Sequence, residues 1–150
     1  MSSQTVRNAI TNFIQTELPG ENLIDLTIEF QEIRDMIEDA GLTSLDPWLG
    51  LQFVGGEEVP VDIAASNTVG KYREEGIIYL HIVEIAKLGP KNAIITRADF
   101  IRSKFRGQRI GDLVVRRVSP PQTGLGVTLN FEGGYTAALV QVDYSMDFDL

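Results

Sequence analysis

Residues 76–86 read GIIYLHIVEIA, and this stretch decides the fold class of the chain. In an extended backbone, successive side chains point to opposite sides, so a strand with two apolar sides needs cover on both. Only His81 and Glu84 interrupt the apolar run. The stretch therefore predicts a central strand of a sheet that is covered on both faces. One side presents Ile78, Leu80 and Ile82, and the other presents Ile77, Tyr79, Val83 and Ile85.

Helix and strand patterns surround this stretch. Apolar residues recur with helical spacing up to about residue 18 and again from Gly89-Pro90 to about Phe105. The segment 135–148 alternates apolar and polar residues, as a long strand with one buried side does. We therefore expect one α+β domain spanning residues 1–150. Its sheet should be mixed, mainly antiparallel and twisted, with two to three flanking helices.

Further elements are predicted between these. Gly55-Gly56 lies between two strand-like runs, 48–54 and 58–64, which favours a hairpin. The remaining expected elements are an acidic helical segment at about 29–40 that ends at Gly41, strands at 113–118 and 126–131, and polar loops at 65–75 and 119–125. The two loops are long enough to become ordered only when a partner binds.

The amino-acid composition argues against several classes of function. The chain has 150 residues and no cysteine, which excludes disulfides, thiolate nucleophiles and zinc–thiolate sites. Its N-terminus lacks the apolar core of a signal peptide, and its longest apolar run is too short to span a bilayer. These features predict folding in a reducing cytoplasm without contact with membranes. A net charge of −8 argues against general nucleic-acid binding.

The charges are unevenly distributed along the chain. Residues 1–62 hold twelve acids and two arginines, whereas seven bases lie between positions 97 and 117. The acidic part of one copy could therefore dock onto the basic part of the next, because complementary electrostatic potentials fix the register of association. Two alternatives are that the charges only solvate exposed helix faces, or that the basic stretch makes weak, sequence-independent contacts with phosphates. The arginines predicted to form a subunit or partner interface are Arg102, Arg106, Arg109, Arg116 and Arg117.

No residue pattern indicates catalysis or a cofactor. His81 is the only histidine, and its place among apolar residues is typical of a structural histidine. Asp143, Asp147 and Asp149 would share one strand face, but neighbours two residues apart are nearly 7 Å apart, which is wide for one cation. The glycine-rich segments lack the helix that phosphate loops require. We therefore expect no enzyme activity, no cofactor and no metal.

The second half of the chain resembles the tail-terminator and minor-tail family of long-tailed bacteriophages. The matching segments are, in order, EEGIIYLHIVEIA, NAIITRADFIRSKFRG, DLVVRRVSPP, GLGVTLNFEGGY and AALVQVDYSMDFDL. The early helix VRNAITNFIQTEL is also similar to the helix with which members of the family begin. The resemblance covers about two thirds of the chain and rests on the order of elements. Residues 21–46 and the two strands after them depart from it.

This resemblance implies a structural virion protein that acts in the tail or neck and is assembled in the host cytoplasm. Members of the family form a ring, usually a hexamer, on the head-proximal end of the tail tube. The ring stops growth of the tube and joins it to the head connector, while DNA passes through the lumen with at most non-specific contact. The departing segment leaves a head-closure or neck adaptor as an alternative. A small enzyme or a nucleic-acid-binding accessory protein is the competing class.

Overall fold

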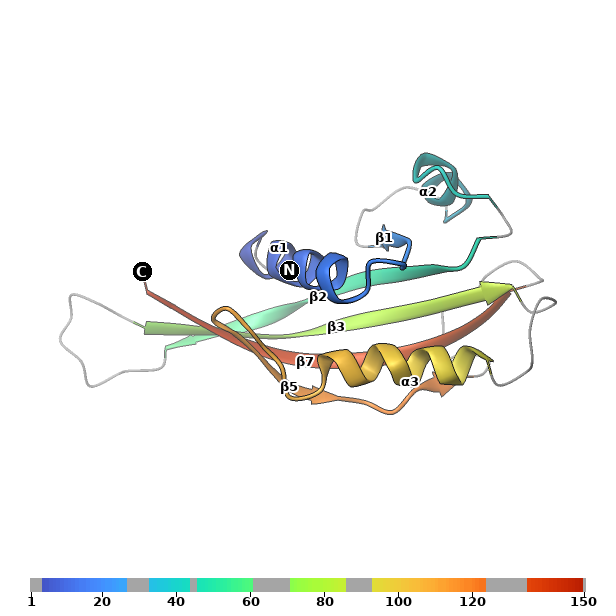
Figure 1. The fold of residues 1–150 in the computed structure, drawn as a ribbon. Coiled ribbons are helices and arrows are strands. Elements are labelled where there is room, and N and C mark those ends of the chain that lie inside the picture. Colours follow the sequence, from blue (N-terminus) through green and yellow to red (C-terminus); the bar gives the residue numbers. More distant parts are fainter. Residues whose placement is uncertain are drawn as a thin grey trace.

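The computed structural model describes residues 4–26, 33–43, 46–60, 71–85, 93–123 and 135–149. These residues form an α+β fold in which one curled mixed sheet carries helices on both faces (Figure 1). The strands follow the order β1-β2-β3-β7-β5-β4, and β6 pairs with β7 off this path. The elements are α1 (Gln4–Glu17), β1 (Leu23–Asp25), α2 (Ile33–Asp39), β2 (Trp48–Pro60), β3 (Lys71–Ile85), α3 (Ala93–Phe105), β4 (Arg109–Ile110), β5 (Leu113–Val118), β6 (Gln122–Thr123) and β7 (Tyr135–Asp149).

The sheet is built around β3 and β7. These two strands pair antiparallel from Lys71↔Asp149 to Ile85↔Tyr135 without a register shift. β2 pairs with the other side of β3, and β5 pairs with the other side of β7, both antiparallel. The pairing of β1 with β2 is parallel, which makes the sheet mixed. The prediction of a mixed, mainly antiparallel sheet is therefore confirmed, and the predicted central strand is confirmed over residues 76–85, since residue 86 lies outside the described residues.

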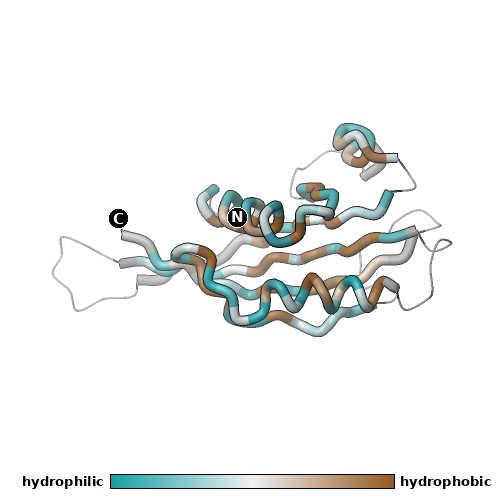
Figure 2. Tube along the Cα trace, in the orientation of Figure 1, coloured by the Kyte–Doolittle hydropathy of each residue, from teal (hydrophilic) through white to brown (hydrophobic). Residues whose placement is uncertain are grey.

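The main core lies between the sheet and the pair α1 and α3, which cover the same face (Figures 1 and 2). Phe13 of α1 meets Phe105 of α3 edge-on, with ring centroids 5.0 Å apart. We call this side of the sheet the α1/α3 face. The fully buried strand residues that point to it are Leu49, Ile78, Leu80, Ile82, Leu113, Ala138, Val140 and Val142.

Arg97 of α3 ties the helix to other elements at one end of the core. Its Nε donates to Glu21 Oε1 at 3.2 Å, and its Nη2 donates to Glu21 Oε2. Its Nη1 donates to the Val83 carbonyl at 3.0 Å and reaches Glu84 Oε1 at 3.4 Å. One of the seven bases between positions 97 and 117 is therefore used to hold α3, the chain after α1 and β3 together.

The opposite face of the sheet is covered at one end by α2. A second apolar cluster joins Met36 and Ile37 of α2 to Trp48 and Val83 of the sheet. α2 ends in a Schellman motif: Gly41 N donates to Glu38 O at 2.9 Å and Leu42 N donates to Ile37 O at 3.0 Å. The φ of +75° at Gly41 suits glycine, as the predicted helix end requires.

The prediction of a hairpin at Gly55-Gly56 is wrong. β2 runs continuously through these glycines, and both of its halves pair with β3. The register shifts between Val54 and Glu57, because three steps along β2 match two steps along β3. The two glycines therefore lie at a β-bulge, the other structure that glycines within strands commonly indicate.

Other boundaries also differ from the sequence prediction. Residues 71–75 were expected in a loop but belong to β3, where β7 pairs with them. Gln122 and Thr123 were also expected in a loop and form β6 against β7. The strand expected at 126–131 lies outside the described residues, as do residues 61–70 and the start of the acidic helical segment at 29–32.

Gly76 provides a test of the packing at the centre of the sheet. It pairs with Tyr144 across β3 and β7, and a Cβ added at residue 76 would lie 2.5 Å from Tyr144 Oη. Tyr144 is 2% exposed, and its hydroxyl donates to Glu74 Oε2 at 3.1 Å, so the ring is held in place. We expect Gly76→Ala to lower the free energy of unfolding by about 1–3 kcal/mol through overpacking.

Urea unfolding measures this change, and Gly20→Ala is the matched control. No atom lies within 4 Å of a Cβ added at Gly20, so this substitution should change stability by less than about 0.5 kcal/mol. An equal effect of the two substitutions would contradict the proposed role of Tyr144.

Candidate functional site

The five arginines predicted to form an interface are divided between two places in the fold. Arg109, on β4, and Arg117, on β5, occupy sheet positions opposite those that point to the α1/α3 face. Arg116 is the extra residue of a second bulge, between Val115 and Arg117. The bulge turns the Arg116 side chain toward β7, where its Nε donates to Ser145 Oγ at 2.7 Å. All three arginines are exposed.

The other two arginines belong to the end of α3. Arg102 is partly buried, and its Nη2 donates to the Val118 carbonyl at 3.4 Å, which links α3 to β5. Its Nε is buried and has no hydrogen-bond partner among the described residues. Arg106 is exposed in the turn after the helix. The structure therefore gives Arg102 a role in packing and sets both residues apart from the group on β4 and β5.

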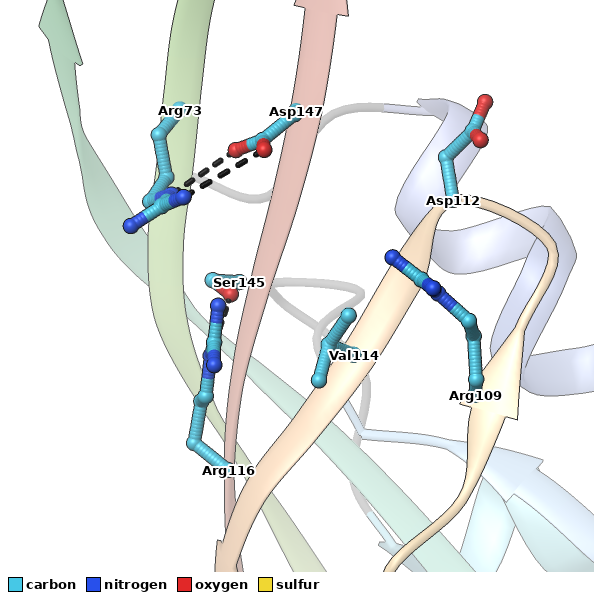
Figure 3. A pocket seen from close by; sticks show the side chains of 7 residues that line it. All are labelled: Arg73, Arg109, Asp112, Val114, Arg116, Ser145 and Asp147. Atoms are coloured by element: carbon cyan, nitrogen blue, oxygen red, sulfur yellow. Dashed lines mark hydrogen bonds and ion pairs between the residues drawn. The ribbon is translucent and has the colours of Figure 1, made fainter. Parts of the chain in front are cut away.

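Figure 3 shows a hollow, with a volume of about 290 Å³. The strand register places it on the face of the sheet opposite α1 and α3, at the end away from α2. The guanidinium groups of Arg73, Arg109 and Arg116 converge on it from three strands (Figure 3). We call this site the arginine hollow. Its lining residues are Arg73, Arg109, Asp112, Val114, Arg116, Ser145 and Asp147.

Arg73 was not singled out from the sequence. It comes to the site because β3 pairs Arg73 with Asp147 of β7. Arg73 Nε donates to Asp147 Oδ1 at 2.7 Å, and Nη2 donates to Oδ2 at 3.3 Å. The hydrogen bond to Asp147 and the charge of that carboxylate raise the pKa of Arg73. The alternating pattern of β3, continued through polar residues 71–75, is the only sequence signal that leads to Arg73.

The hollow contains more positive than negative charge. Asp147 forms an ion pair with Arg73, whereas Arg109 and Arg116 form no ion pair with any described residue. Arg116 donates a hydrogen bond to the neutral Ser145 hydroxyl, and Asp112, which also lines the hollow, forms no ion pair with either arginine. Guanidinium groups without carboxylate partners bind carboxylates or phosphates through two parallel hydrogen bonds. The arrangement can therefore bind an anionic group of a partner.

His81 lies on the same face of the sheet as the hollow, in the middle of β3. It is 3% exposed, and its Nε2 lies 2.9 Å from Gln52 Oε1. Its Nδ1 is buried without a partner among the described residues. Burial lowers its pKa to about 4, so the ring is neutral at pH 7. This position agrees with the interpretation of His81 as a structural histidine.

Asp143 and Asp147 of β7 have different partners. Asp143 Oδ1 accepts a hydrogen bond from Gln141 Nε2 at 2.9 Å, and Asp147 binds Arg73. The side chain of Asp149 lies outside the described residues. Within those residues, no group of three histidine, cysteine or acidic side chains has an arrangement that would hold a metal ion.

Comparison with known proteins bears on the fold alone. No protein-family profile matches the chain, and no characterised protein matches its sequence. Twenty chains among the solved structures match its fold. One of them, whose name describes no function, has 15% sequence identity and a TM-score of 0.54 over 99% of this chain and 97% of that chain. In the described part of the chain, no helix is long and apolar enough to cross a membrane.

The buried His81 predicts a pH dependence of stability. An unfolded chain binds a proton at His81 near pH 6.5, whereas the folded chain binds it only near pH 4. The stabilisation linked to neutral His81 is therefore complete above pH 6.5 and is lost as the pH falls from 6.5 to 4. The loss should be on the order of 2–3 kcal/mol.

Chemical denaturation between pH 7 and pH 4 can isolate this contribution. The free energy of unfolding of the wild type should fall more steeply than that of His81→Gln, which has no group that titrates in this range. The carboxylates contribute equally to both proteins. Parallel curves for the two proteins would show that His81 is not buried in its neutral form.

Proposed function

We propose that this chain is a structural virion protein, a ring-forming tail terminator that caps the head-proximal end of a phage tail tube and joins it to the head connector. Such a protein acts through the surfaces that it offers to other subunits and not through an active site. Its ring is a homo-oligomer, and a hexamer is the stoichiometry that the family resemblance implies. The proposal places the chain in the virion neck or tail.

The observation that carries this proposal is the arrangement of β3, α3, β5 and β7. Of the segments that resemble the family, the described parts form β3, β5 and β7 of one sheet and the helix α3, which covers the same face as α1. The β3–β7 pair extends past α1 toward the C-terminal end (Figure 1). That extension carries the arginine hollow, and none of the described helices covers it. A charged sheet surface beyond the helices suits contact with another subunit.

A head-closure or neck adaptor is a second candidate. Its support is the segment that departs from the resemblance, which forms β1 and α2 and builds a separate apolar cluster with Trp48 and Val83. An added helix of this kind provides a further surface for a different partner. The two candidates share the same class of function and differ in the protein that the chain binds.

Two measurements on the purified full chain test the proposal. Native mass spectrometry, alone and with tube protein, should show a closed oligomer, and addition of the chain to polymerising tube protein should stop growth of the tubes. Binding to the connector without any effect on tube growth would favour the neck adaptor. A monomer at all salt concentrations that neither stops tube growth nor binds the connector would contradict both candidates.

A further inference from the structure

The sheet face that carries the arginine hollow has opposite charges at its two ends. Odd-numbered residues of β3 point to this face, from Arg73 in the hollow to Val83 under α2. These two residues are ten positions apart, which corresponds to about 33 Å along a strand. α2, which lies at one end of this face, carries the exposed acidic residues Asp35 and Glu38. The hollow displays arginines at the other end (Figure 3).

The acidic end is fixed in position. Met36 and Ile37 anchor α2 on the sheet, while Asp35 and Glu38 are exposed. Residues three apart on a helix lie side by side, so the two carboxylates form one pair. Neither of them forms an ion pair with another described residue. A helix that presents two adjacent carboxylates is a suitable partner for two guanidinium groups.

The basic end has the matching arrangement. Arg109 and Arg116 come from neighbouring strands and point into the hollow without a carboxylate partner among the described residues (Figure 3). Val114 lies between them and gives the floor an apolar part, so a docked helix would also bury apolar surface. The hollow therefore offers two cations at a place where an exposed helix end can approach.

We infer that the arginine hollow of one copy binds α2 of the next copy, with Arg109 and Arg116 facing Asp35 and Glu38. Within one chain the two ends are too far apart to meet, so the contact has to form between copies. It joins two different patches, and repeated contacts of this kind close into a ring when the rotation between copies permits. This inference rests on the proposed function, because it identifies the interface of the proposed ring.

Charge reversal on each side of the contact tests the inference. We expect Arg109→Glu/Arg116→Glu and Asp35→Lys/Glu38→Lys each to weaken self-association about tenfold or more at low salt, because like charges then face each other. Mixing the two variants should restore association through the swapped pair. Analytical ultracentrifugation of each variant and of the mixture measures this. Association of the wild type should weaken as the salt concentration rises.

Arg106→Glu is the matched control for the single variant Arg109→Glu, because it makes the same charge change at an exposed residue that does not line the hollow. It should leave association unchanged. If the loss of the Arg116 contact with Ser145 unfolds the double variant, Arg109→Glu alone provides the test, since no hydrogen bond is found for the Arg109 side chain among the described residues. Circular dichroism confirms folding before each comparison.

The outcomes separate this inference from the proposed function. If both reversed variants still form the oligomer and stop tube growth, the inferred contact is wrong and the proposed function stands. If the contact behaves as expected but the wild type does not affect tubes or connectors, the proposed function is wrong and the self-association stands. If the arginine variant loses salt-dependent binding to DNA but keeps its self-association, the hollow binds phosphates and the inference is overturned.

Discussion

The rest of the structure depends on the unbroken antiparallel pairing of β3 with β7. Fifteen residues of each strand pair without a register shift, so a single alternation assigns the described side chains of both strands to one face or the other. Even-numbered residues such as Ile78 and Val140 build the core under α1 and α3. Odd-numbered residues lie on the opposite face, and among them are Arg73, His81 and Val83. A one-residue slip would exchange the core and the candidate site.

The strands on either side of this pair adapt to it through bulges. β2 contains one extra residue relative to β3 near Gly55-Gly56, and β5 contains one extra residue relative to β7, at Arg116. The first bulge lets a long strand follow β3 past the helices, and the second directs a charged side chain to Ser145 on β7. The regular pair thus fixes the sheet, and the irregular neighbours determine which side chains reach the hollow.

This difference explains how much could be predicted from the sequence. The helices around Ile10 and Ile101 and the strands at 76–85 and 135–148 follow from periodicity, because each buries one regular pattern of side chains. The glycine pair Gly55-Gly56 is compatible with either a turn or a bulge. Both halves of β2 pair with β3, so the structure has a bulge there, and this pairing could not be read from the sequence. Arg109 and Arg116 were identified from charge alone. Arg73 was missed because its place depends on pairing with a residue 74 positions away.

The ion pairs among the described residues show which of their charges folding has already neutralised. Arg97 binds Glu21 and Glu84, Arg73 binds Asp147, and Arg7 lies 3.6 Å from Asp25. Each of these pairs joins elements that are neighbours in the fold, where the two charges need little extra ordering to meet. Arg109 and Arg116 at one end of the sheet, and Asp35 and Glu38 of α2 at the other, form no ion pair with a described residue, and the length of β3 separates the two sets. The geometry of the long strand pair therefore prevents these two sets of charges from neutralising each other within one chain and leaves both sets exposed to other molecules.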